Sequence, residues 1–151
     1  MIIAVDNKNL SEAAYVHSIS WKESHRSFCS PDFIEMHSPQ RQEEYLLQKI
    51  ADGSRLYMLV EERPVGIVSI TGSLIEDLYI LPDQQNRGYG TKLLRYAIGQ
   101  CTDVPTLWLL ENNKDAERLY RRMGFRSTGR RNSITNELDE IEFAFDLWTD
   151  N

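Results

Sequence analysis

The hydrophobic residues of the chain recur at two different spacings, and these spacings predict its helices and strands. Apolar residues three or four positions apart indicate an amphipathic helix, whereas a short apolar run between turn residues indicates a strand. Helices are expected at residues 11–28, 39–52, 91–101 and 113–123. Strands are expected at residues 2–5, 55–61, 65–70, 74–81, 106–110, 126–134 and 141–148. This set of about seven strands and four helices predicts an α/β (α+β) protein.

The order of these elements also predicts how the strands pair. Residues 55–61, 65–70 and 74–81 are joined by short turns, so they should form an antiparallel meander. The connection from 74–81 to 106–110 passes through a helix, and these two strands should therefore be parallel. A mixed, mostly antiparallel sheet with one parallel pair follows. The length suits one domain, expected to span residues 1–151.

Residues 74–101 carry the clearest functional signal. An apolar strand is followed by a loop that contains Gly88 and Gly90, and then by a helix. This arrangement aims several backbone N–H groups and the positive end of a helix dipole at one point, where anions such as phosphate bind. The glycines fit this role because a Cβ would hold a phosphate oxygen away from the amides. Arg87 and Lys92 add positive charge.

Two common phosphate-binding loops do not match this glycine pair. A Walker loop requires G-x-x-x-x-G-K-[ST], but Gly88 and Gly90 are too close together and Thr91 precedes Lys92. A dinucleotide fingerprint requires a third glycine where this chain has Leu93. The loop does match [RQ]-x-x-G-x-[GA], reading Gln85-Asn86-Arg87-Gly88-Tyr89-Gly90. In this it resembles the acetyl-CoA loop of the GNAT superfamily of N-acetyltransferases.

A second pattern later in the chain supports this resemblance. The pattern N-x-x-A-x-x-[LF]-Y-x-x-x-G-F of the same superfamily is matched by Asn113, Ala116, Leu119, Tyr120, Gly124 and Phe125. Each residue also has an ordinary explanation as a helix cap, part of a core stripe or a closing glycine. Chance alone poorly explains both patterns in the right order. The resemblance covers residues 56–125 by motif and the rest by element order.

The resemblance implies a fold, a cofactor and a reaction. In GNAT proteins the two parallel strands at the sheet centre splay apart, and the pantetheine arm of acetyl-CoA inserts between them. An acetyl group would move from acetyl-CoA to a primary amine by direct attack in a ternary complex, and the Ile80 amide would receive the carbonyl oxygen. The residues implied in cofactor binding are Leu78, Tyr79, Ile80, Gln85, Asn86, Arg87, Gly88, Tyr89, Gly90, Thr91, Asn113, Ala116 and Tyr120.

The reaction also needs an acid and a base. Tyr120 occupies the family's general-acid position, with a packed core tyrosine as the alternative. An alkylammonium, with a pKa near the lysine value of about 10.4, must lose a proton before it attacks. Many family members place the basic glutamate where this chain has Leu74. Because Glu76 and Asp77 are consecutive, they should face opposite sides of the strand. Glu76 shares the Leu74 side and is the expected base, with an ordinary strand-end carboxylate as the alternative.

Other features restrict the partners of the chain. Trp21, His25 and Phe28 share one face of the first helix, where they would line the acceptor site or form core. A net charge of −6 and an isoelectric point near 5.1 disfavour nucleic acid. No apolar run is long enough to cross a membrane. Cys29 and Cys101 have neither disulfide nor metal spacing, which favours a reducing, cytoplasmic location and no bound metal.

The acceptor is expected to be a small-molecule or peptide amine, and a homodimer is left open. A non-catalytic acyl-CoA-binding or regulatory module is the main alternative function, because Leu74 stands where the family's base is expected. A nucleotide-binding phosphotransferase is disfavoured by the failed Walker match. The sequence does not identify the amine.

Overall fold

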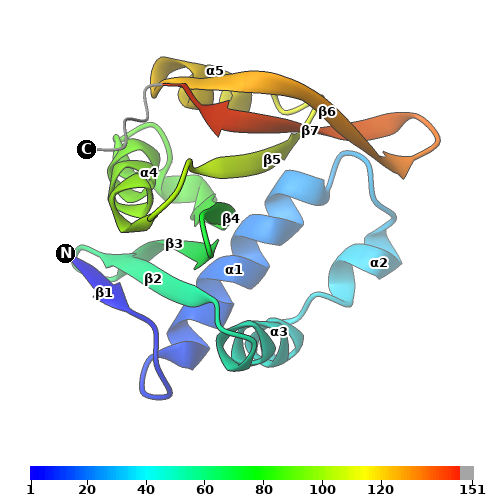
Figure 1. Ribbon diagram of the computed structural model, residues 1–151. Helices are drawn as coiled ribbons and strands as arrows, with labels where there is room; N and C mark the ends of the chain where they lie inside the picture. The colour runs from blue at the N-terminus through cyan, green and yellow to red at the C-terminus, as the bar shows by residue number, and fades with distance from the viewer. Residues whose placement is uncertain (147–151) are drawn as a thin grey trace.

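Seven strands form one mixed sheet in the order β1-β2-β3-β4-β5-β7-β6 in the computed structural model, which describes residues 1–146 (Figure 1). The strands are β1 (Ile2–Ala4), β2 (Arg55–Val60), β3 (Pro64–Thr71), β4 (Leu74–Ile80), β5 (Thr106–Leu110), β6 (Phe125–Thr135) and β7 (Leu138–Phe145). Neighbouring strands are antiparallel except for the β4 and β5 pair. The predicted meander and the predicted parallel pair are both confirmed.

Helices cover both faces of this sheet. They are α1 (Leu10–His25), α2 (Pro31–Glu35), α3 (Pro39–Ala51), α4 (Tyr89–Gln100) and α5 (Lys114–Arg122), with a short 3-10 helix η1 (Pro82–Gln84) after β4. One core forms where α1 and α3 cover β1 to β3. A second core forms where α4 covers the centre of the sheet and α5 lies against β6. Because β3 contributes to both cores, it is buried along almost its whole length.

Local capping residues explain where the helices begin and end. The Ser38 side chain accepts from the Arg41 N–H at 3.2 Å, and Pro39 is the first helical residue of α3, as expected. Gly53 follows α3 with φ of 101°, the left-handed conformation that ends many helices. The sequence analysis expected four helices and missed α2, which has only 5 residues and starts at the analogous pair Ser30 and Pro31. A single turn is too short to show a helical period.

Two predicted boundaries were wrong by three residues each. The first helix was expected to reach Phe28 but ends at His25, so Phe28 lies in the turn that follows. The last strand was expected at 141–148 but begins at Leu138, because β6 and β7 are joined by a tight turn with Thr135 opposite Leu138. Residues 147 and 148 of that prediction lie outside the described residues.

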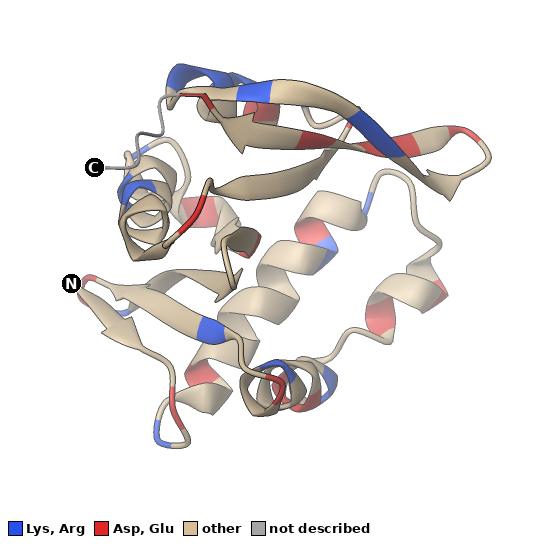
Figure 2. Ribbon diagram, viewed as in Figure 1, with Lys and Arg blue, Asp and Glu red and all other residues tan. Residues whose placement is uncertain are grey.

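Most charged residues are not buried. In the hairpin of β6 and β7, basic residues lie on β6 and acidic residues on β7 (Figure 2). Basic side chains on β6 face acidic ones on β7, with Arg131 to Asp139 at 3.1 Å and Arg130 to Glu142 at 3.2 Å. Such cross-strand pairs favour this register of the hairpin. Within residues 1–146, no helix is long and apolar enough to span a membrane.

Candidate active site

The parallel strands β4 and β5 separate after a very short contact. They pair only at Leu74 with Thr106 and at Ile75 with Leu107, and beyond Ile75 no pairing with β5 is recorded. On its other side, β4 stays paired with β3 as far as Ile80. Residues 76–80 therefore have backbone groups that face a gap rather than a neighbouring strand.

The alternation of amides shows which groups face this gap. The Leu81 N–H donates to the Val65 carbonyl of β3 at 2.9 Å. Successive N–H groups of a strand point to opposite sides in the sheet plane, so the Ile80 N–H points away from β3 and toward the gap. This is the N–H group that the family resemblance implied as the donor to the carbonyl oxygen of the thioester.

A bulge in β4 corrects the prediction that Glu76 and Asp77 face opposite sides. Ser69 pairs with Glu76 and Ile67 pairs with Tyr79, so two residues of β4 lie opposite Val68. Asp77 has φ of 53°, outside normal strand geometry. As a result, both carboxylates reach the same ammonium of α3: Lys49 Nζ lies 3.1 Å from Glu76 Oε1 and 2.8 Å from Asp77 Oδ2. A count of alternating residues cannot detect such an extra residue.

Asp77 is the most heavily contacted carboxylate of the site. His17 Nε2 lies 3.2 Å from Oδ1, and the Tyr45 hydroxyl and the Ser69 hydroxyl donate to the carboxylate at 3.2 Å and 2.9 Å. Burial alone would raise the pKa of Asp77, but contacts with His17 and Lys49 hold it well below its usual range. The same carboxylate helps to raise the pKa of Lys49 against the effect of burial. Asp77 is therefore ionised, and both of its carboxylate oxygens contact neighbouring side chains.

Glu76 is more open to solvent than Asp77. Its side chain is 40% exposed, against 12% for Asp77. Apart from Lys49, the described part of the chain gives its carboxylate only a long contact of 3.4 Å from the Thr71 hydroxyl. Of the two carboxylates, Glu76 is the one with room to accept a proton.

The predicted anion-binding loop lies at the start of α4. Asn86 and Gly88 have φ of 65° and 84°, so the chain turns through two left-handed residues before the helix. Lys92 makes the first helical hydrogen bond, to the Gly88 carbonyl. Among the described residues, no acceptor is recorded for the backbone N–H groups of residues 86–91. These free donors and the helix dipole are the features that bind phosphate.

The two loop glycines have different reasons to be glycine. Gly88 has a positive φ that L-residues rarely adopt, although a Cβ there would meet no atom within 4 Å. A Cβ on Gly90 would lie at ordinary contact distance, 3.5 Å from Leu119 Cδ2 and 3.9 Å from Ile80 Cγ1. The backbone thus requires glycine at 88, whereas at 90 there is room for a Cβ.

The second motif forms α5 as expected. The Asn113 side chain caps the helix by accepting from the Ala116 N–H at 3.2 Å, and Gly124 closes it with φ of 107°. Ala116 and Tyr120 pack against the core that α4 covers. No hydrogen bond to the Tyr120 hydroxyl is recorded within residues 1–146. Burial raises the pKa of Tyr120 to about 12, so the phenol keeps its proton at neutral pH.

Tyr79 places a second phenol near the gap. Its ring lies edge-on to His17, with centroids 5.2 Å apart, so the side chain faces α1. Burial, with the nearby charge of Asp77, raises its pKa above the usual range, and the Ser24 hydroxyl of α1 lies close by. Tyr79 and Tyr120 therefore approach the gap from opposite faces of the sheet.

The three residues expected to line the acceptor site belong to an aromatic cluster at the end of α1. The Trp21 ring stacks on His25 at 4.0 Å and on His37 at 3.5 Å, and His25 lies 5.1 Å from Phe28. Burial lowers the pKa of His25, and His37 adds to this effect, although a hydrogen bond to the Trp21 carbonyl opposes it. Of the three, only Phe28 lines the neighbouring cavity.

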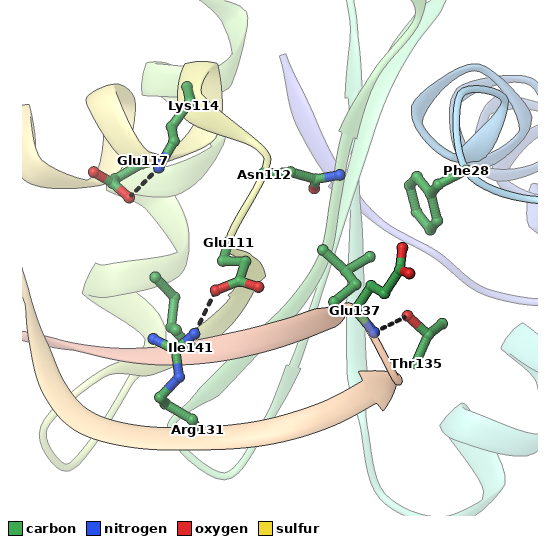
Figure 3. A pocket seen from close by; sticks show the side chains of 10 residues that line it. Phe28, Glu111, Asn112, Lys114, Glu117, Arg131, Thr135, Glu137 and Ile141 are labelled. Carbon is green, nitrogen blue, oxygen red and sulfur yellow. Dashed lines mark hydrogen bonds and ion pairs between the residues drawn. The ribbon is translucent and has the colours of Figure 1, made fainter.

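This cavity, of about 680 Å³, lies between the end of α1 and the hairpin of β6 and β7 (Figure 3). Phe28, Leu138 and Ile141 provide its apolar lining. Its charged lining residues are Glu111, Glu117, Glu137, Lys114 and Arg131. Lys114 pairs with Glu117 and Arg131 pairs with Glu111. The Glu137 carboxylate has no ion-pair partner among the described residues, and Figure 3 shows it pointing toward Phe28.

Sequence reasoning missed the groups that surround Asp77, namely His17, Tyr45 and Lys49. For Lys49, the sequence did contain a sign of a buried contact. Tyr45, Leu46, Lys49 and Ile50 share one face of α3, and a lysine within an apolar stripe needs a buried partner. His17 lies on the inner face of α1 and is 2% exposed, but helical spacing alone gives no sign of its contact with Asp77. Within residues 1–146, no group of three potential metal-ligating side chains is found.

Comparisons with known proteins agree with this arrangement. Residues 14–125 match the family model described as Acetyltransferase (GNAT) family. The chain is 30% identical over 106 residues to the peptidyl-lysine N-acetyltransferase YjaB of Escherichia coli K12, covering 69% of this chain and 68% of that protein.

Two solved structures have a similar fold. The solution structure of apo-form YjaB from Escherichia coli has a TM-score of 0.70 and 22% identity, covering 96% of both chains. The PaiA N-acetyltransferase of Thermoplasma acidophilum, in complex with coenzyme A, also has a TM-score of 0.70, with 16% identity, 94% of this chain and 96% of that one. From the open strand pair, the loop before α4 and these matches together, we conclude that the chain belongs to the GNAT family of acetyltransferases.

Proposed function

We propose that this protein transfers the acetyl group of acetyl-CoA to the side-chain amine of a lysine in a peptide or protein. As a GNAT family member the protein is an acetyl-CoA-dependent N-acetyltransferase, and the new element of the proposal is the acceptor. The observation that supports a lysine is the cavity beside Phe28, which combines apolar walls with an unpaired carboxylate. The name of the Escherichia coli relative, a peptidyl-lysine N-acetyltransferase, supports the same acceptor.

The residues at the gap offer the donors that coenzyme A requires. The free N–H groups of residues 86–91 would hold the pyrophosphate, with Gln85 at the start of the loop and Arg87 adding positive charge. The unpaired backbone of Leu78, Tyr79 and Ile80 would hold the pantetheine arm, with Asn113, Ala116 and Tyr120 on the α5 side. Bound acetyl-CoA supplies a thioester carbonyl to the reaction.

The protein would contribute three groups to the transfer. The Ile80 N–H would donate to the carbonyl oxygen as negative charge develops there. The Tyr120 hydroxyl would donate to the departing sulfur. Because the Tyr120 pKa of about 12 exceeds a thiol pKa of about 8.5, this phenol stabilises the developing charge as a hydrogen-bond donor more readily than it gives up its proton. Glu76 would remove the proton of the incoming ammonium, directly or through water.

The acceptor would approach from the side of α1 and the hairpin. A lysine stem can lie along Phe28, Leu138 and Ile141, while positive charge is attracted to Glu137. Trp21 and His25 would support Phe28 from behind rather than touch the acceptor. We also propose a cytoplasmic location, supported by the free thiols of Cys29 and Cys101. A homodimer stays a prediction.

The acceptor proposal is tested by offering acetyl-CoA with peptides that contain one lysine and a blocked N-terminus. We expect thiol release together with an acetyl group on the lysine Nε, located by mass spectrometry. A matched peptide with arginine in place of the lysine should give no product. Acetylation of small amines but not of the peptide would exclude the proposed acceptor. Binding of acetyl-CoA without transfer to any amine would favour the non-catalytic module.

Gly88→Val should weaken coenzyme A binding at least tenfold while leaving most of the fold intact. A β-branched residue strongly disfavours the left-handed conformation that Gly88 adopts, so the loop amides would turn away from the pyrophosphate. Calorimetry with coenzyme A measures the loss. Gly99→Ala, in the helix that follows the loop and at a position with open space for a Cβ, is the control and should bind normally. Unchanged affinity of Gly88→Val would move the phosphate site elsewhere.

Tyr120→Phe should lower kcat by about 10² or more, the usual scale for a catalytic hydrogen-bond or proton donor. Its melting temperature should hardly change, because the lost hydroxyl leaves no described protein group without a partner. Steady-state kinetics and a thermal melt, measured on the same preparation, separate the two effects. A normal kcat combined with a lower melting temperature would make Tyr120 a core residue only.

Glu76→Gln should reduce kcat most at low pH and progressively less at high pH. At low pH nearly all acceptor is an ammonium that needs a base, whereas near about pH 10 much of it is already neutral. The pH profile of kcat measures this, with Glu44→Gln, at an exposed position of α3, as the control. A loss of equal size at every pH would exclude Glu76 as the base.

A further inference from the structure

We propose that Asp77 is a positioning residue: held by side chains of α1, α3 and β3, it fixes the left-handed bulge that keeps β4 open toward the cofactor. The proposal rests on the proposed function, because it assigns the open strand to acetyl transfer. It gives Asp77 no direct contact with the reacting atoms.

The bulge requires something to hold it in place. Asp77 has φ of 53°, a conformation that a non-glycine residue adopts only at a cost in free energy. A second cost in free energy arises on the side that faces β5. There the backbone after Ile75 is unpaired and lacks the hydrogen bonds of a regular strand. A straight β4 would recover both, so contacts outside the strand must favour the bulged form.

The Asp77 side chain supplies such contacts from three elements. His17 of α1 lies 3.2 Å away, Lys49 of α3 lies 2.8 Å away, and Ser69 of β3 donates at 2.9 Å. Tyr45 of α3 adds a longer contact of 3.2 Å. Because these donors come from separate elements and the carboxylate is only 12% exposed, the side chain has little freedom to leave this position.

The donors are themselves held in place. His17 Nδ1 lies 2.8 Å from the buried Gln42 amide of α3, and the His17 ring stacks on Tyr45 with centroids 5.4 Å apart. Lys49 Nζ also donates to the Ser69 hydroxyl at 2.9 Å and reaches Glu76. The cluster thus joins two helices and two strands at the bulge, and its titratable members are His17, Tyr45, Lys49, Glu76 and Asp77.

The bulge determines which way every later residue of β4 faces. Leu78 and Ile80 pack on the α4 side, whereas Tyr79 faces α1. Removal of the extra residue from the register would shift this alternation by one position and turn each of these side chains to the other face. The Ile80 N–H, proposed to receive the carbonyl oxygen, would turn with them. Asp77 therefore controls catalytic geometry through the backbone.

Asp77→Asn tests this role with little change in shape. Asparagine has the size of aspartate and tolerates the left-handed conformation, but it carries no charge to attract Lys49. In the free protein, we expect slower amide hydrogen exchange confined to residues 76–80, because a straight β4 would pair with β5 and protect the amides that now face the gap. Coenzyme A should bind about tenfold more weakly if the open form falls to about a tenth of the population. The kcat/KM for acetyl-CoA should fall by a similar factor at every pH, unlike the pH-dependent loss expected for Glu76→Gln.

Two further variants keep the result interpretable. Asp77→Asn leaves the Lys49 ammonium without its main partner and risks unfolding, so the double variant Asp77→Asn with Lys49→Met removes both charges. It should show the same slower exchange in β4. Thr128→Ala is the control, because it removes a part-buried hydrogen bond of 2.8 Å to Glu142 in the hairpin of β6 and β7, which contains no residue of the bulge. It should lower stability without changing exchange at residues 76–80.

Each result decides the proposal. Wild-type exchange in β4 and wild-type coenzyme A affinity, with only a lower melting temperature, would reduce Asp77 to a stabilising residue. A loss of kcat confined to low pH would make Asp77 the base instead. If the wild-type protein acetylates no amine, the proposed function fails, but the exchange measurement in the free protein still tests the role of the bulge.

Discussion

The Lys49 ammonium of α3 contacts the Asp77 carboxylate of β4 at 2.8 Å, and both side chains are largely buried. This contact joins α3 to the point where β4 separates from β5. A buried ion pair offers little net stability, since both charges must leave water. Its value here is geometric, because it ties α3 to one particular residue of β4. Around that residue, β4 stays paired with β3 along one edge and is separated from β5 along the other edge.

The order of the elements along the chain determines which of them surround the gap. The chain from β4 to α5 is continuous and provides the open strand, the loop before α4 and Tyr120. The proposed acceptor cavity is lined by the turn after α1, by the hairpin of β6 and β7, and by the segment that leads from β5 into α5. The segment from β5 to α5 would therefore contribute to both sites, and cofactor and acceptor would meet beside it.

The sequence predicts the regular parts of this structure well, because regular structure follows from repeating patterns. The strand order around the parallel pair, the caps at Ser38 and Asn113 and the loop at Gly88 all follow from spacing and residue type. The bulge does not, since nothing in the letters Glu76-Asp77-Leu78 marks an extra residue. The opposing faces expected for Glu76 and Asp77 were wrong for this reason, and Lys49 was missed because its partners are distant in sequence.

The origin of the cavity walls has a consequence for how this protein can change. The turn after α1 and the tip of the hairpin lie on the surface, where insertions and substitutions are tolerated more readily than in the central strands. Neither segment contributes an N–H group to the loop before α4 or a pairing contact to β4. Substitutions in these exposed segments can therefore change which amine is accepted without changing the residues that bind acetyl-CoA. Proteins with the same sheet can consequently acetylate quite different amines.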